Sequence, residues 1–182
     1  IGAVVEKPTE GDALLVSSRE VPHVLLRADG ADLERLQPAR RLSALPAPVL
    51  DIIAAMKHAH PMDVLRTAVS AMAGFNPGSE RTDRAAMIDQ TIRLTAQAPM
   101  IVAAHDAIRN GRAPVAPDPA LGHAANWLWM LKGRKPSEDA ARLADIDFIL
   151  HAEHGSNASA FTARVVIGTE ANLHAAVTAA IA

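Results

Sequence analysis

The longest periodic segment of the chain covers residues 82–110, and it constrains the fold more than any other stretch. Its apolar residues recur at the spacing of one helical face, and Asn110-Gly111 is a typical helix end. Pro99 lies within the segment, so we expect the helix to be kinked there or split in two. The residues of the expected apolar face are Met87, Ile88, Ile92, Leu94, Ile101, Val102 and Ile108.

Most of the remaining chain shows the same helical spacing. Pro48 suits the first turn of a helix, Gly74 suits a helix end, and Ser137 and Asn157 are suitable N-caps. A proline-rich run over 112–119 predicts an extended linker. The other predicted helices cover residues 20–28, 31–42, 48–59, 62–73, 120–131, 137 to about 154, 157–166 and 172–182.

The composition also favours an all-α fold. Aromatic residues make up only 3% of the chain, and tyrosine is absent. The core must therefore be built from Ala, Leu, Ile, Val and Met, which is typical of closely packed helices. With 49% hydrophobic and 21% charged residues, the 182-residue chain has a globular composition. This length suits one domain of ordinary size, or one domain and part of another.

Residues 1–18 carry two short apolar runs separated by turn-forming residues. The runs are residues 3–5 and 13–16, and Pro8 and Gly11 lie between them. They predict either a small hairpin or a loosely attached terminal arm, and the sequence does not choose between the two.

Several classes of partner and location are excluded by charge and composition. The net charge is −2 and no basic block stands out, so we expect no nucleic-acid partner. No apolar run is long enough to cross a bilayer and no leader is recognisable, so we expect neither a membrane partner nor secretion. The absence of cysteine excludes disulfides and thiolate chemistry and fits a reducing compartment, which predicts a cytoplasmic protein.

Chemically active side chains concentrate in one stretch, residues 150–164. Two helical patterns meet there, and Gly155-Ser156 interrupts them. His151 and His154 lie about 60° apart on a helical wheel, and His154 falls in the last turn of the first helix. A histidine at one helix end and free N–H groups at the start of the next, near Asn157, form a pattern that can hold a small carboxylate. Arg164 adds a positive charge if it lies on the side of its helix that faces this junction.

Two other interpretations of this stretch stay open. The histidines are equally well explained as simple helix caps. His151, Glu153 and His154 are also potential metal ligands, but HExxH is absent and no second cluster of acidic residues and histidines is obvious, so we expect no metal.

The other histidines and the two tryptophans have less informative surroundings. His60, His105 and His123 are isolated in helical contexts and are interpreted as structural. Trp127 and Trp129 face different sides of their helix, which predicts one core residue and one interface or groove residue.

The same stretch, LHAEHGSNASAFTAR, closely resembles the substrate-site signature of the citrate synthase family, which includes 2-methylcitrate synthases. The resemblance continues from about residue 45 to residue 182. Three further segments carry it: HPMDVLRTAVS at 60–70, LGHAANWLWMLKGRKPS at 121–137 and NLHAAVTAAI at 172–181.

The resemblance implies a Claisen-type condensation of acetyl-CoA or propionyl-CoA with oxaloacetate, giving citrate or 2-methylcitrate and CoA. By the same resemblance, His154 hydrogen-bonds oxaloacetate, Asn157 belongs to its pocket, and Ser159 orients the main catalytic histidine. His151 and Arg164 match signature positions of less defined role. No cofactor is implied, because the acyl-CoA is a substrate. The family also implies a homodimer formed through helices packed across a two-fold axis.

The sequence departs from the family in two places. The GPLHGGAN loop with its catalytic histidine, the second histidine, the general-base aspartate, the substrate arginines and the CoA-binding small domain have no counterpart in these residues. The family's LxYRGYxIxxL-like segment before the equivalent of Glu20 is also missing. We therefore expect an N-terminal arm over 1–44 and a large helical domain over 45–182, active only within a parent chain of full family length. The alternative is a non-catalytic helical module for dimerisation or for binding an organic acid.

Overall fold

The computed structural model describes residues 12–16, 26–29, 44–151 and 157–181. Within these ranges it contains two strands and seven helices, and helices dominate, as predicted. The elements are β1 (Asp12–Val16), β2 (Leu26–Asp29), α2 (Ala47–Ala55), α3 (Pro61–Met72), α4 (Arg84–Arg109), α5 (His123–Lys132), α6 (Glu138–Leu150), α7 (Ala158–Ile167) and α8 (Leu173–Ala180). In the described residues no helix is both long and apolar enough to cross a membrane.

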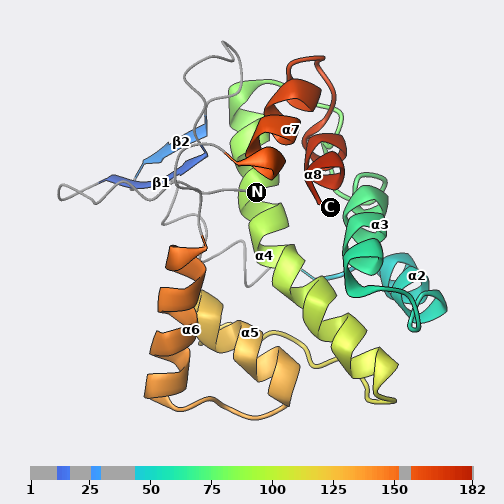
Figure 1. The fold of residues 1–182 in the computed structure, drawn as a ribbon, viewed down its shortest axis with the longest axis vertical. Helices are drawn as coiled ribbons and strands as arrows, with labels where there is room; N and C mark the ends of the chain where they lie inside the picture. The colour runs from blue at the N-terminus through green and yellow to red at the C-terminus, as the bar shows by residue number, and fades with distance from the viewer. Residues whose placement is uncertain (1–11, 17–25, 30–43, 152–156, 182) are drawn as a thin grey trace.

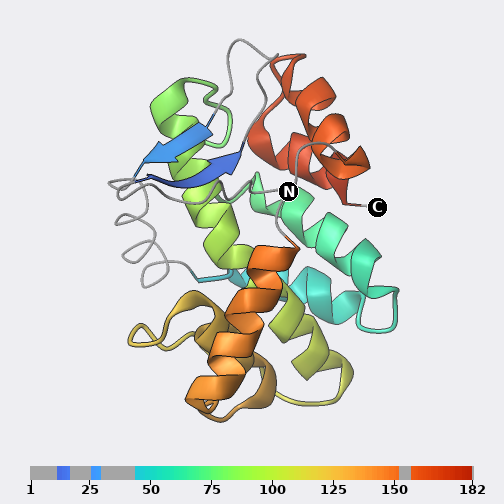
Figure 2. The same cartoon turned by 60° about the vertical axis from the view of Figure 1, so that its left-hand side comes forward.

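Helix α4 is central to the fold and packs against α2, α3, α5 and α8, whereas α6 packs on α5 and α7 packs on α8 (Figure 1). The pair α7–α8 lies at the end where α4 begins, next to α3, whereas α5 and α6 lie toward the end where α4 finishes (Figure 2). Asp83 caps α4 by accepting a hydrogen bond at Oδ1 from the Ala86 N–H, at 3.1 Å. Because α4 is covered from several sides, residues on most of its surface are buried.

Of the two alternatives predicted for Pro99, a kink or a split, the split is wrong, since a single helix of 26 residues runs through this position. A proline inside a helix removes one backbone hydrogen bond, here the one to the carbonyl of Thr95. Both neighbours of this turn, Leu94 and Ile101, are buried in the core, and their packing holds the backbone helical across the defect. The other predicted residues of the apolar face are buried or half-buried, but Val102 is 41% exposed.

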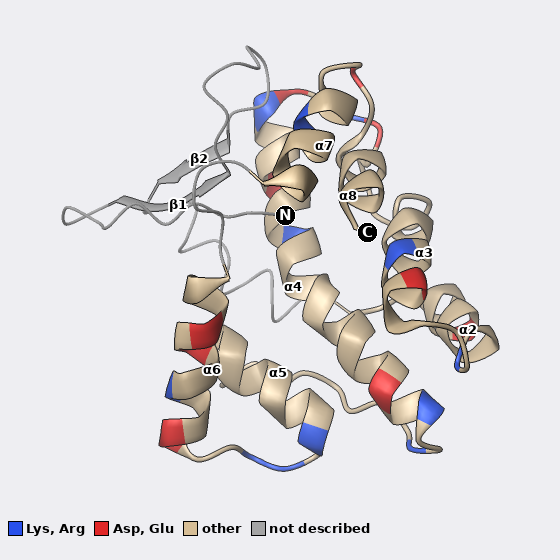
Figure 3. Ribbon diagram, in the orientation of Figure 1, with Lys and Arg blue, Asp and Glu red and all other residues tan. Residues whose placement is uncertain are grey.

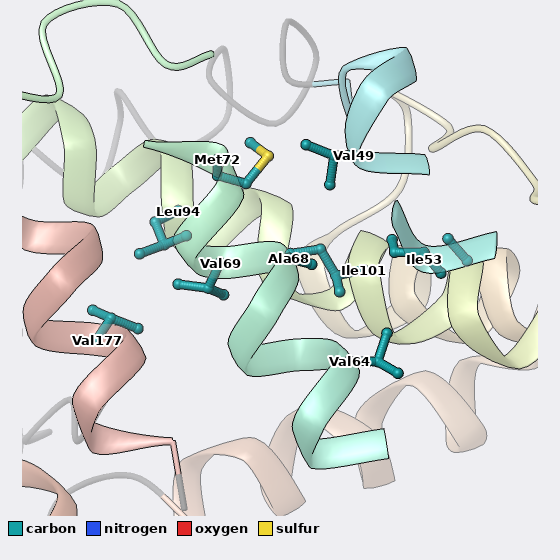
Figure 4. Packing of buried hydrophobic residues seen from close by; sticks show 10 residues of the cluster. Val49, Ile53, Val64, Ala68, Val69, Met72, Leu94, Ile101 and Val177 are labelled. Atoms are coloured by element: carbon teal, nitrogen blue, oxygen red, sulfur yellow. The ribbon is translucent and has the colours of Figure 1, made fainter. Parts of the chain in front are cut away.

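The main core lies where α2, α3, α4 and α8 meet (Figure 4). Residues of α2 and α3 form most of it, because positions three and four apart on a helix share one face. Each buried Val, Leu, Ile or Met contributes about 1.5–3 kcal/mol. The buried members are Val49, Ile53, Val64, Ala68, Val69, Met72, Leu94, Ile101, Ala104 and Val177.

A second packing region joins α5 to α6. Phe148 lies against the rings of Trp127 and His123, with centroids 5.3 and 5.7 Å apart. Trp129 donates a hydrogen bond from its indole N–H to the carbonyl of Ala116, at 2.9 Å. Both tryptophans are half-buried, so the prediction that one of them would be a core residue is wrong.

The N-terminal strands form an antiparallel hairpin, with Val16 opposite Leu26 and Asp12 opposite Asp29. A hairpin was one of the two predictions for the arm, but the predicted partner strand, residues 3–5, lies outside the described residues. The helix predicted over 20–28 is wrong at its end, because residues 26–28 belong to β2. Pairing with β1 overrides the local helical pattern there. The helix predicted over 31–42 also lies outside the described residues.

Candidate functional site

The N-terminus of α7 is the part of the predicted site that the structure defines best. Asn157 has the extended backbone of an N-cap, and its Oδ1 accepts a hydrogen bond from the Ala160 N–H at 2.8 Å. The cap was predicted, and it satisfies one of the four N–H groups that lack an intrahelical acceptor. The amides of Ala158 and Ser159 lie in the same first turn, where the positive end of the helix dipole favours an anion.

Ser159 and Arg164 lie on the same helix but at different ends of it. Ser159 is half-buried in the first turn of α7, and Arg164 is half-buried in the last turn. At 100° and 1.5 Å per residue, they differ by about 140° in direction and about 7.5 Å along the axis. Around the helix axis, the directions of Arg164 and Asn157 differ by only about 20°, and Arg164 lies two turns further along the helix. Asn157 and Ser159 therefore both lie at the start of α7 but on different sides of it, whereas Arg164 lies at the far end on the side of Asn157.

His151 is the C-cap of α6 and is 77% exposed. Its Nδ1 donates to the carbonyl of Asp147 at 2.9 Å, and the carboxylate of Asp147 lies 3.4 Å away. Helix α6 itself ends at Leu150, before the predicted end near His154. This is the geometry of a helix cap, which was one of the interpretations that the sequence left open for His151.

His154 and Glu153 lie outside the described residues, so the structure places neither of them. The described residues contain no group of three or more His, Cys, Asp or Glu that could hold a metal ion. The proposed ligand set of His151, Glu153 and His154 is not tested by that finding, because two of its members are not described.

Helices α7 and α8 carry little charge themselves, and Figure 3 shows further charged residues on the segment between them and at the start of α4. Arg164 is the only charged residue within α7, and α8 has none. The N-terminus of α7 therefore meets no carboxylate from its own helix or from the helix packed against it. The dipole of α7 favours an anion at the N-terminus of the helix, and Arg164 adds positive charge in its last turn.

The isolated histidines have structural roles, as predicted. His60 caps α3 by accepting a hydrogen bond at Nδ1 from the Met62 N–H. His105 is buried, with Nε2 3.4 Å from the carbonyl of Lys57. His123 packs its ring on Phe148.

One buried polar cluster was not foreseen. Asn76, Gln97 and His174 come from the loop after α3, from α4 and from α8, and they are hydrogen-bonded beneath α8. Burial lowers the pKa of His174 below its ordinary value. The only signal in the sequence was a lone polar residue among apolar neighbours, such as His174 between Leu173 and Ala175.

The chain matches the family described as "Citrate synthase, C-terminal domain" over residues 17–182. It is 44% identical over 124 residues to a citrate synthase of Haloferax volcanii, covering 66% of this chain and 33% of that protein. It is 37% identical over 176 residues to a 2-methylcitrate synthase of Mycobacterium tuberculosis, covering 97% of this chain and 40% of that protein.

The fold agrees with the sequence match. The crystal structure of a citrate synthase from Pyrobaculum aerophilum superimposes with a TM-score of 0.75 at 32% identity, covering 82% of this chain and 40% of that one. A citrate synthase from Thermotoga maritima gives a TM-score of 0.68 at 26% identity, covering 82% and 38%. The chain thus spans well under half the length of these relatives.

Proposed function

Because this chain belongs to the citrate synthase family, we propose that the full-length protein condenses an acyl-CoA with oxaloacetate and releases CoA. The products are citrate from acetyl-CoA or 2-methylcitrate from propionyl-CoA. The relatives include proteins of both names, and acyl choice depends on small differences in pocket volume. The described part of this chain supplies the oxaloacetate side of the site.

The observation that carries this proposal is the capped N-terminus of α7. Oxaloacetate is a dianion, and a helix N-terminus offers N–H groups and a positive dipole end to a carboxylate. The side-chain oxygen of Asn157 accepts a hydrogen bond from the Ala160 N–H at 2.8 Å, and this bond fixes the orientation of the side chain. The amide nitrogen on the same side chain is then held in a defined direction, as a donor for an oxygen of the substrate.

The other site residues take roles around this turn. His154 donates a hydrogen bond to oxaloacetate, and Ser159 orients a catalytic histidine supplied by the rest of the full-length protein. Arg164 adds positive charge from the last turn of α7, and His151 ends α6 on the other side of the junction. The hydrogen bonds from His154 and Asn157 and the positive charge of Arg164 stabilise the alkoxide that forms when the ketone of oxaloacetate is attacked, whereas His151 serves as a helix cap.

The reaction needs groups from outside this chain. A carboxylate base removes a proton from the carbon next to the thioester carbonyl, and a histidine hydrogen-bonds the resulting enol. The enol carbon forms a bond to the ketone carbon of oxaloacetate, and water then cleaves the thioester to release CoA. The full-length protein is a cytoplasmic homodimer that requires no cofactor, and its partners are its two substrates. This chain alone is inactive.

The assay follows CoA release by the full-length protein with oxaloacetate and either acetyl-CoA or propionyl-CoA. We expect activity with at least one thioester and none from the 182-residue chain alone. His154→Ala raises the KM for oxaloacetate at least tenfold, because one charge-assisted hydrogen bond contributes about 1.5–3 kcal/mol. The matched control is His151→Ala, which removes an exposed cap three residues away and should change that KM little.

Two results would refute the proposal. Absence of CoA release with both thioesters would favour a non-catalytic module that binds an organic acid or dimerises. An unchanged oxaloacetate KM in His154→Ala, with its circular dichroism spectrum intact, would remove the assigned role of His154.

A further inference from the structure

A buried polar network holds α8 against the centre of the fold. Asn76, Gln97 and His174 are 6%, 3% and 0% exposed, and they come from three segments that are distant in the sequence. Helix α8 is otherwise attached by apolar contacts such as Val177 in the main core. The network is thus the main directional attachment of α8 within the described residues, together with the bond that Arg66 donates to the carbonyl of Ile181 at 3.2 Å.

The orientation of the network is fixed by a backbone carbonyl. The Nε2 of Gln97 donates to the carbonyl of Ala44 at 3.5 Å and to Oδ1 of Asn76 at 3.4 Å. The Nδ2 of Asn76 donates back to Oε1 of Gln97 at 3.2 Å. Because a carbonyl can only accept, the Ala44 oxygen sets the direction of the Gln97 amide, and Gln97 in turn sets that of Asn76.

The same chain of donors fixes the tautomer of His174. Its Nε2 lies 2.9 Å from Nδ2 of Asn76, which already acts as a donor. Nε2 must therefore accept, and the ring proton sits on Nδ1. The Nδ1 atom is fully buried and has no hydrogen-bond partner among the described residues.

Protonation of His174 is incompatible with this arrangement. It would place an N–H on Nε2 that points at the NH₂ group of Asn76, so two donors would face each other. Rotating the Asn76 amide would relieve that contact, but it would set Nδ2 of Asn76 against Nε2 of Gln97. Rotating Gln97 as well would withdraw its donor from the Ala44 carbonyl. No rotation satisfies all four groups.

No charged neighbour compensates for the buried imidazolium. Helices α3, α4 and α7 pack against α8. The charged residues of these three helices are Asp63 and Arg66 on α3, Arg84, Asp89, Arg93, Asp106 and Arg109 on α4, and Arg164 on α7. Burial lowers the pKa of His174, and no charged group contributes to that shift.

We propose that His174 is an acid-sensitive latch: neutral, it ties α8 to Asn76 and Gln97, and on protonation it releases α8 together with α7. Helix α7 follows because its packing partner is α8. The attachment of α7, the helix that carries Asn157 and Ser159, would therefore depend on pH.

The direction of the pH dependence follows from the lowered pKa. In the released state His174 titrates near its ordinary value of 6.5, whereas in the latched state it titrates at lower pH. Between the two values the released state binds more protons, so lowering the pH favours release. The contribution of His174 to the latch is present above pH 6.5 and is lost progressively as the pH falls from 6.5 toward the lowered value.

Hydrogen–deuterium exchange of the 182-residue chain tests the latch. After correction for the intrinsic rate, the exchange of α8 and α7 amides should increase between pH 7.5 and 5.5, by up to about tenfold, which is the limit set by an unfolded pKa of 6.5. The exchange of α5 and α6 amides should not increase over the same pH range. In His174→Gln this increase should disappear, whereas the control His123→Gln should retain it. A pH-independent α8 in the unmodified chain, or an undiminished increase in His174→Gln, would overturn the proposal.

Nitrogen NMR of the unmodified chain keeps the test valid if His174→Gln does not fold. At pH 7.5 the His174 ring should show a protonated Nδ1 and an unprotonated Nε2, and its pKa should lie below 6.5. The opposite tautomer, or a pKa at or above 6.5, would overturn the proposal.

Discussion

Replacing Ile101 by alanine should destabilise the fold strongly. Ile101 is 1% exposed and lies in the core formed by α2, α3, α4 and α8 (Figure 4). The change removes three carbon groups, each of which contributes about 0.8 kcal/mol of transfer free energy. The cavity left behind adds to this loss, so the free energy of unfolding should fall by about 3 kcal/mol. For a chain of this size the unfolding temperature should fall by about 6–12 °C.

Val102 provides the matched control, because it is the next residue of the same helix and is 41% exposed. Val102→Ala should change the free energy of unfolding by less than about 0.5 kcal/mol, since little burial is lost and alanine favours the helix. Urea unfolding of both variants, followed by circular dichroism at 222 nm, measures the difference. Equal losses in the two variants, or a larger loss in Val102→Ala, would refute the assignment of the α4 faces.

Two further predictions concern helix ends. Gly133, the C-cap of α5, has a φ of +67°, and a Cβ added there would meet nothing closer than Val115 at 3.9 Å. Gly133→Ala should therefore lower the free energy of unfolding by about 1 kcal/mol through backbone conformation alone. Urea unfolding measures this loss. The pKa of Asp83 is lowered chiefly by the hydrogen bond from the Ala86 N–H. Its contribution to stability is therefore present above pH 3.8 and is lost as the pH falls through the lowered value. In Asp83→Asn, which keeps the cap without the charge, the urea midpoint should depend less on pH in this range, and an unchanged dependence would contradict the assignment.

The helices and their caps were predictable because their signals are local. Ser137 caps α6 and Asn157 caps α7, each by accepting a hydrogen bond from the backbone N–H three residues on. Such a cap needs only one polar side chain followed by a periodic apolar segment. The helical period alone predicted the presence of α2 and α3 in the same way.

The errors came from interactions between distant segments. Residues 26–28 have a helical pattern but pair with β1, and α4 continues through Pro99 because its neighbours are buried. The His174 network joins residues 98 positions apart, and no local pattern could show that His174 meets Asn76. Tertiary contacts decide each of these features, and a single sequence does not display them.

The candidate site could be predicted only in part, for the same reason. Its location at the start of α7 followed from the junction of two helical patterns, and the structure confirms the Asn157 cap there. The relation between Ser159 and Arg164 required the actual bounds of the helix, which place them in its first and last turns. The binding roles of all the site residues stay predictions, and His154 lies outside the described residues.

The central claim is that the N-terminus of α7 holds oxaloacetate, and two equivalent caps test it most directly. Asn157 and Asn172 each accept a hydrogen bond from the N–H three residues on, at 2.8 Å, at the starts of α7 and α8. Replacing either by alanine in the full-length protein should cost about 1 kcal/mol of stability. The measurement is the KM for oxaloacetate in both variants. We predict an increase of at least tenfold in Asn157→Ala and little change in Asn172→Ala, and equal values in the two variants would contradict the claim.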